Sequence, residues 1–117
     1  MSFDFTIDVT DPHAGVAVVR VAGRLESRAA QELRRRCSDL RDSGRSKILI
    51  NLSGISFVAS SGVGTLLALT EESKEAGGSV QLVSLSHAVA AVVDLLNLTE
   101  FLAIFDTESK ALETLGV

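Results

Sequence analysis

Hydrophobic and polar residues alternate along the first part of the chain, over residues 3–10. A period of two is typical of a β-strand that buries one face, and we expect this strand at the edge of a sheet. Pro12 and Gly15 then give residues 11–15 the chemistry of a turn. A more apolar run follows at residues 16–22, so the two segments predict an N-terminal β-hairpin.

Beyond this hairpin the apolar residues change their period. Ala30, Leu33, Cys37 and Leu40 are spaced by three and four positions, which predicts a helix over residues 27–43 with these side chains on one face. The rest of the chain continues the alternation, with expected strands at 47–52 and 55–58, a helix from Ser60 or Ser61 to about Ala76, a strand at 80–83, a helix after Ser86, a strand at 103–105 and a helix at 107–115.

This order of elements predicts an α/β fold. A hairpin followed by alternating helices and strands gives a mixed, mostly parallel sheet of about five strands, joined by right-handed crossovers and covered by about four helices. The chain has 117 residues, which is the length of one ordinary domain. We therefore expect a single domain over residues 1–117.

The charge balance argues against a nucleic-acid partner. Lysine and arginine total 11 against 15 aspartate and glutamate residues, for a formal net charge of -4, and the chain has five phenylalanines but no tryptophan or tyrosine. Nucleic-acid binding needs a dense basic face and aromatic residues for stacking. The one basic cluster, residues 34–36, is expected on the solvated face of a helix.

The inventory of reactive side chains is small. Two histidines, one cysteine and no tyrosine leave few groups for acid-base or nucleophilic chemistry, so we expect no enzyme, no cofactor and no metal. Cys37 cannot form an internal disulfide, no secretory signal opens the chain, and the longest apolar run, residues 88–93, is too short to span a membrane. These features predict a soluble cytoplasmic protein without membrane insertion.

Ser60 and Ser61 stand at the expected start of a helix, and two interpretations of them remain open. In the first, one hydroxyl is an N-cap that accepts a hydrogen bond from a free backbone N–H of the first turn, which stabilises a helix by about 1 kcal/mol. In the second, one serine carries a phosphoryl group, which the N–H groups and the dipole at a helix start favour.

Other chemistries fit the same segment poorly. A dinucleotide-binding loop needs a third glycine where Leu67 stands, and a Walker loop needs a lysine that is missing. A nucleophile elbow needs a glycine before its serine, where this chain has Val58 or Ala59. A hydrolase built from Ser60, His87 and Asp94 is therefore not expected.

Four motifs along the chain form a recognisable pattern: Asn51-Leu52-Ser53 ahead of Phe57, Ser60-Ser61-Gly62 followed by Leu66-Leu67, the loop Gly23-Arg24-Leu25-Glu26, and the ending Ile104-Phe105 with Ala111-Leu112. Together these motifs resemble the STAS family, the domain of anti-sigma factor antagonists. The similarity spans nearly the whole chain, and the serine segment is its most specific part.

The resemblance implies a regulatory switch. Soluble members bind an anti-sigma factor that is also a serine kinase, which frees a sigma factor, and phosphorylation ends that binding; a serine phosphatase can be a further partner. By position the phosphorylated residue is Ser60, with Ser61 as the alternative. The implied partner surface comprises Gly23, Arg24, Leu25, Glu26, Ser27, Ala59, Ser60, Ser61, Gly62 and Val63.

The chain departs from the family pattern at three positions. Ala59 replaces an aspartate before the serine, Asn51 replaces an aspartate at a strand end, and Glu26 keeps the charge of an aspartate on a longer side chain. Ala59 in particular favours an alternative role, a phosphorylation-independent STAS accessory subunit of a stress-signalling complex or of a lipid transporter.

Overall fold

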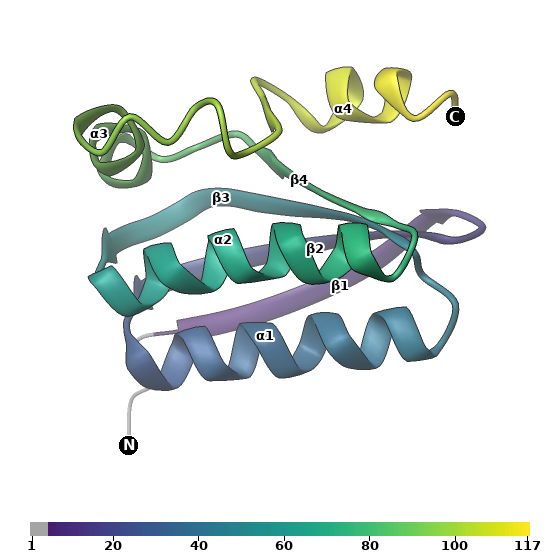
Figure 1. Ribbon diagram of the computed structural model, residues 1–117, viewed down its shortest axis with the longest axis horizontal. Coiled ribbons are helices and arrows are strands. Elements are labelled where there is room, and N and C mark those ends of the chain that lie inside the picture. The colour runs from purple at the N-terminus through teal and green to yellow at the C-terminus, as the bar shows by residue number, and fades with distance from the viewer. Residues whose placement is uncertain (1–4) are drawn as a thin grey trace.

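A computed structural model describes residues 5–117 as one five-stranded sheet with four helices (Figure 1). The strands are ordered β1-β2-β3-β4-β5; β2 runs antiparallel to β1, while β3, β4 and β5 run parallel to their neighbours. This confirms the predicted α/β, mostly parallel fold. The elements are β1 (Phe5–His13), β2 (Val16–Leu25), α1 (Ser27–Asp42), β3 (Lys47–Val58), α2 (Ser60–Glu75), β4 (Ser79–Val83), α3 (His87–Leu95), β5 (Ile104–Phe105) and α4 (Glu108–Thr114).

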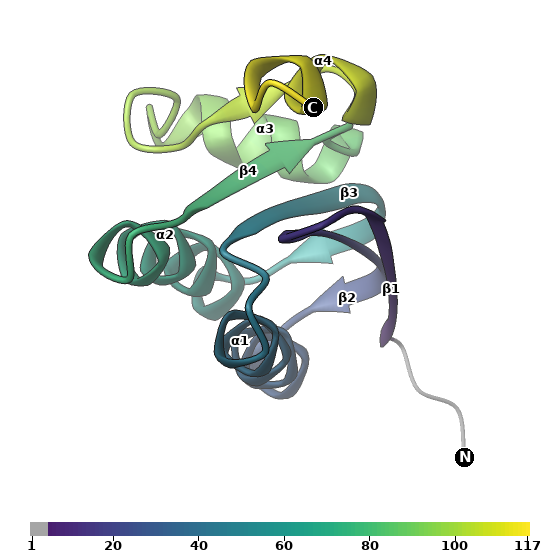
Figure 2. The same cartoon turned by 90° about the vertical axis from the view of Figure 1, so that its right-hand side faces the viewer.

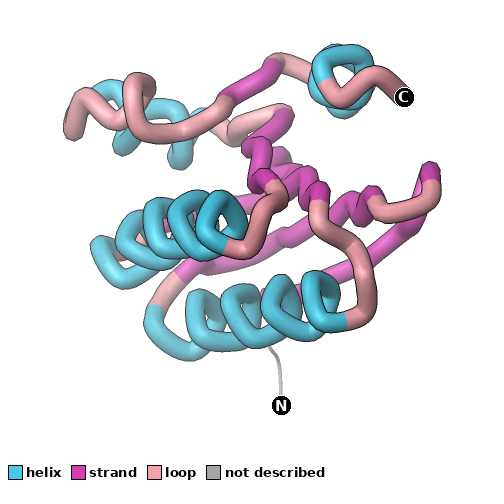
Figure 3. Tube along the Cα trace, turned by 45° about the vertical axis from the view of Figure 1, so that its right-hand side comes forward, coloured by secondary structure: helices cyan, strands magenta, loops and turns pink. Residues whose placement is uncertain are grey.

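The sheet separates a large core from a small one. Along β3, Ile48 and Ile50 face the large core beneath α1, α2 and α3, while Leu49 between them faces the small core that includes Ala111 of α4. Figures 2 and 3 show α1 and α2 side by side on one side of the strands, with α4 at the far end of the molecule. The C-terminal helix therefore closes a second core of its own.

Cys37 lies in the large core, on the predicted apolar face of α1. Burial raises the pKa of its thiol to about 12, so this cysteine is packed as a small apolar residue rather than presented as a nucleophile. None of the helices within residues 5–117 is long and apolar enough to cross a membrane.

The hairpin turn is shorter than predicted. Residues 3 and 4 lie outside the described part of the chain, and β1 continues beyond Thr10 to His13, so Pro12 belongs to the strand. The register between β1 and β2 shifts between Thr10 and His13, which marks a bulge. An edge strand tolerates a proline at a bulge because the missing N–H need not pair there. The turn contracts to Ala14 and Gly15, where Gly15 has a φ of 77°.

The two strands predicted at 47–52 and 55–58 are one continuous strand, β3. The polar break between them is an irregularity in pairing, because the register with β2 shifts between Arg20 and Ala22. Gly54 lies so close to Ala22 that a Cβ at position 54 would be 2.7 Å from the Ala22 Cβ. The break in the apolar pattern therefore reflects a close approach of two strands rather than a turn.

Candidate functional site

The two segments predicted to form a partner surface lie side by side. In the parallel pairing of β2 and β3, Arg24 is opposite Phe57 and Leu25 is opposite Val58. The pairing continues one residue further, because the Ala59 N–H donates to the Leu25 carbonyl oxygen at 3.0 Å. Both strands therefore end at the same edge of the sheet, where α1 and α2 begin (Figure 1).

Gly62 holds the start of α2 against the end of β2. A Cβ at position 62 would lie 2.5 Å from the Leu25 carbonyl oxygen and 2.9 Å from both Leu25 Cγ and Val58 Cγ2. Any larger residue must push the helix away from the strand. Gly62 is itself buried, so its role at this site is to set a distance rather than to present a surface.

Ser60 and Ser61 do not cap α2, and the N-cap interpretation is wrong. The N-cap residue is Ala59, with φ −88° and ψ 169°, and no side chain accepts a hydrogen bond at this end. Strand pairing explains the offset, since the bond from Ala59 to Leu25 holds Ala59 extended and makes Ser60 the first helical residue. By contrast, Ser86 caps α3 and accepts from the Val89 N–H at 3.2 Å.

Both serines are exposed, so their hydroxyl groups stand on the surface beside the end of β2. Neither serine acts as an N-cap, which is the most common role of a serine at a helix start. Ala59 and Val63 next to them are half-buried, while Gly62 is buried. The small apolar surface around the serines is therefore made by Ala59 and Val63.

Residues 23–26 are a strand end rather than a loop. Gly23, Arg24 and Leu25 belong to β2, and Glu26 is the N-cap of α1. The side chain of Leu25 is fully buried, so it can only position its neighbours, whereas Arg24, Glu26 and Ser27 are exposed. Gly23 has a φ of 108°, a conformation that favours glycine, and its carbonyl oxygen accepts a hydrogen bond from Ser56 Oγ at 3.2 Å.

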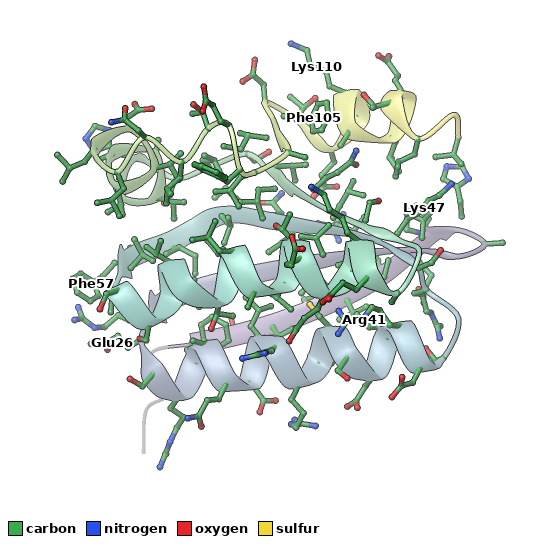
Figure 4. All side chains as sticks on the ribbon, viewed as in Figure 1. Glu26, Arg41, Lys47, Phe57, Phe105 and Lys110 are labelled. Carbon is green, nitrogen blue, oxygen red and sulfur yellow. The ribbon has the colours of Figure 1, made fainter. Side chains whose placement is uncertain are left out.

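Arg24, Glu26 and Phe57 form a compact group beside the serines. Arg24 Nε and Nη2 donate to the two carboxylate oxygens of Glu26 at 3.0 and 3.3 Å, and the Arg24 guanidinium carbon lies 4.3 Å from the centre of the Phe57 ring. The hydrogen bond from Arg24 holds the pKa of Glu26 below its usual value. Figure 4 shows Phe57 and Glu26 at the same end of the molecule, where α1 and α2 begin.

The part played by Phe57 was not visible in the sequence. The residue stands out there only as part of a family motif, while its contact with Arg24 depends on the register between two strands far apart in the chain. One signal is available in the sequence. Phe57 is an aromatic residue directly before Val58, which is buried, and three positions before Ser60, which is exposed. In a strand that alternates, this place predicts an outward-facing ring.

A second polar group ties α4 to the sheet. Arg20 Nε and Nη2 donate to the Glu108 carboxylate at 2.9 and 2.8 Å, and Asn51 Nδ2 donates to Glu108 Oε2 at 2.7 Å. The pKa of Glu108 is lowered, chiefly by the hydrogen bond from Arg20 and further by the one from Asn51. An aspartate at position 51 could not donate this bond, so the asparagine and Glu108 fit each other.

The residues of the disfavoured hydrolase are not assembled. Ser60, His87 and Asp94 are all exposed, and no hydrogen bond joins them within residues 5–117. Within the same residues no group of three or more histidine, cysteine, aspartate or glutamate side chains is placed to hold a metal ion. The reactive groups at this site are therefore the two exposed hydroxyl groups of Ser60 and Ser61.

Comparison with known proteins places this arrangement in a family. The STAS domain model matches residues 8–111. An anti-sigma F factor antagonist of Paenibacillus polymyxa is 26% identical over 106 residues, which cover 90% of this chain and 91% of that protein.

Solved structures agree with the sequence match. The anti-sigma factor antagonist SpoIIAA in its unphosphorylated form has a TM-score of 0.79 and 25% identity, covering 96% of this chain and 98% of its own. An anti-sigma factor antagonist from Mycobacterium paratuberculosis has a TM-score of 0.81 and 25% identity, covering 94% of this chain and 92% of its own. The chain described here belongs to the STAS domain family.

Proposed function

We propose that this protein is an anti-sigma factor antagonist that binds a kinase-type anti-sigma factor and so releases a sigma factor for transcription in the cytoplasm. Its partner surface is the end of β2 and the starts of α1 and α2, and phosphorylation of Ser60 ends the binding. Ser61 is the alternative acceptor, and a serine phosphatase would restore the binding form. The role is regulatory and requires no catalysis by this chain.

The observation that carries this proposal is that both serines are exposed and that neither caps the helix. Ser60 and Ser61 are exposed at the first turn of a helix that no side chain caps, and they adjoin the segment from Gly23 to Ser27 through the contact of Gly62 with Leu25. A kinase can reach these hydroxyl groups without opening the fold. The similarity to antagonists over most of the chain supports the same role.

The physics of the switch is electrostatic. A phosphoserine adds about −1.5 to −2 charge and three acceptor oxygens, taking the formal net charge from -4 to roughly −6. Burying that charge at an interface without a cationic partner costs several kcal/mol, and each 1.4 kcal/mol changes an affinity tenfold. One similar structure, 23% identical, is SpoIIAA from Bacillus in a phosphorylated form, which supports this proposal.

The test combines binding with phosphate mapping. The full chain is titrated with a purified kinase-type anti-sigma factor in the presence of ADP, and the same mixture is then incubated with ATP and analysed by mass spectrometry. We expect a stable complex with ADP, and with ATP a phosphoryl group on Ser60 together with release of the complex. Binding that persists with both serines unmodified would refute the phosphorylation switch, and absence of binding would refute the antagonist role.

Ala59 supports a second candidate, an accessory subunit of a stress-signalling complex or lipid transporter that is never phosphorylated. The residue before Ser60 offers no carboxylate that could orient the hydroxyl or engage a kinase. Affinity capture from the native cell separates the two candidates. Recovery of a transporter ATPase without a kinase-type anti-sigma factor would favour the accessory role.

A further inference from the structure

Five large apolar side chains are exposed among residues 5–117, and one of them stands at the candidate site. Phe57 is 39% exposed and pairs with Arg24 of β2 near the end of β3. The other four lie at or beyond the end of α3 and at the chain end: Leu95, Leu96, Phe101 and Val117. Among the described residues, Phe57 is therefore the large exposed apolar side chain at the candidate site, beside the smaller surface of Ala59 and Val63.

Phe57 is held in place from both sides. Its backbone lies in β3, opposite Arg24 of β2, and the hydroxyl group of the neighbouring Ser56 donates a hydrogen bond to the Gly23 carbonyl oxygen. Across its ring lies the Arg24 guanidinium, which the two oxygens of Glu26 fix in turn. A ring and a guanidinium that are already ordered lose little conformational freedom on binding, and the ordering of side chains is one of the costs of forming an interface.

The charges around the ring indicate what it meets. Glu26, the N-cap of α1, offsets the charge of Arg24, but neither α1 nor α2 has an acidic residue in its first turn, so the positive ends of two helix dipoles remain at this edge. Arg28 in the first turn of α1 is also exposed. This edge is locally cationic in a chain whose net charge is -4, and it suits a partner that presents an apolar pocket with carboxylates on its rim.

We propose that Phe57 and the Arg24 guanidinium stacked on it form the anchor by which this protein docks into an apolar, acid-rimmed pocket of the anti-sigma factor. Glu26 positions Arg24, so the interface extends from the serines onto the end of the sheet. Aromatic and arginine side chains dominate the energy of protein interfaces, which is the reason to place the anchor here. The proposal rests on the proposed function and adds to it the residues that set affinity.

The test compares two exposed phenylalanines. Phe57→Ala is measured against the matched control Phe101→Ala, whose parent residue is 60% exposed and lies in the loop between α3 and β5. Binding of each full-length variant to the purified anti-sigma factor is measured by calorimetry with ADP, and folding is checked by circular dichroism. We expect Phe57→Ala to weaken binding at least about 30-fold and Phe101→Ala to change it less than about twofold.

Further variants separate an anchor from a structural role. Phe57→Leu keeps an apolar side chain but removes the ring face, and Arg24→Lys keeps the charge but removes the planar stack, so each should weaken binding about tenfold in a fully folded protein. Equal binding by wild type and these folded variants would overturn the anchor while leaving the antagonist role intact. Failure of the wild type to bind would instead overturn the proposed function itself.

Discussion

The Leu25 carbonyl oxygen lies so close to Gly62 that a Cβ at position 62 would be 2.5 Å from it. Leu25 also accepts the hydrogen bond from Ala59 that sets where α2 begins. One backbone carbonyl of β2 thus determines both how closely α2 approaches β2 and at which residue α2 begins. The two segments of the proposed partner surface are therefore joined through backbone contacts.

The first prediction compares two glycines in α2. Gly62→Ala should lower the free energy of unfolding by about 1–3 kcal/mol, because the new methyl group overlaps backbone that cannot move freely. Gly64→Ala should raise it by about 0.5–1 kcal/mol, since nothing lies within 4 Å of a Cβ there and alanine favours a helix. Urea unfolding of both variants checks the signs, and a neutral Gly62→Ala would contradict the close contact.

The apolar periods predicted most of the architecture. The spacing of Ala30, Leu33 and Cys37 placed α1, because a helix that covers a sheet must keep one continuous apolar face, whereas the serines at its start placed α2. The predictions were wrong where pairing between distant strands decides the structure. Residues 53–54 separated two predicted strands, but they lie within one strand, and the residue that Gly54 approaches, Ala22, is far away in the sequence.

The candidate site could be predicted in position but not in detail. The resemblance placed both segments of the partner surface, and parallel strands bring them to one edge. The cap assignment was wrong because the Ala59 to Leu25 bond shifts the helix start by one residue. The stack of Arg24 on Phe57 needed a register between strands, which no local pattern contains.

The second prediction concerns Asn51, which donates to Glu108 Oε2 at 2.7 Å. Asn51→Asp replaces a donor with a second carboxylate, so it should lower the free energy of unfolding by about 1–2 kcal/mol at pH 7. The loss should shrink below about pH 4, where one of the two carboxyl groups takes up a proton. Asn51→Ala is the control, because it removes the hydrogen bond to Glu108 without adding a charge, so both its loss of stability at pH 7 and its recovery at low pH should be smaller than those of Asn51→Asp.

The third prediction is the pH dependence that Glu108 contributes. Arg20 and Asn51 lower the pKa of Glu108 below the ordinary value of 4.5, so its stabilisation is complete above that value and is lost as the pH falls through the lowered pKa. Glu108→Gln should therefore be about 1 kcal/mol less stable than wild type at pH 7, and the difference should shrink steadily as the pH falls below 4.5. Urea unfolding across this range measures it.

Glu113→Gln is the control for that experiment. Glu113 lies on the same helix but has no ion-pair partner within residues 5–117. Its substitution should leave the difference from wild type nearly constant between pH 7 and pH 3. A pH-dependent gap of equal size in both variants would contradict the assignment to Glu108.

The fourth prediction separates charge from folding at Ser60. Ser60→Asp should weaken binding to the anti-sigma factor at least about tenfold. The same substitution should stabilise the fold by about 0.3–1 kcal/mol, because a negative charge in the first turn of α2 interacts favourably with the helix dipole. Ser60→Ala should bind nearly as wild type and accept no phosphate. Ser61→Asp tests the alternative acceptor, and equal binding by Ser60→Asp and Ser60→Ala would exclude an electrostatic switch at this residue.

The last prediction restores the family residue before the serine. Ala59 is the N-cap of α2 and offers no side-chain acceptor, so Ala59→Asp should stabilise the helix by about 0.5–2 kcal/mol and also place a carboxylate beside Ser60. If a carboxylate helps the kinase, the rate of phosphate incorporation should rise. Ala59→Asn caps the helix equally well without charge, so it separates the two effects. A rate that rises equally in both variants would assign the gain to capping, and one that rises only with aspartate would assign it to the carboxylate.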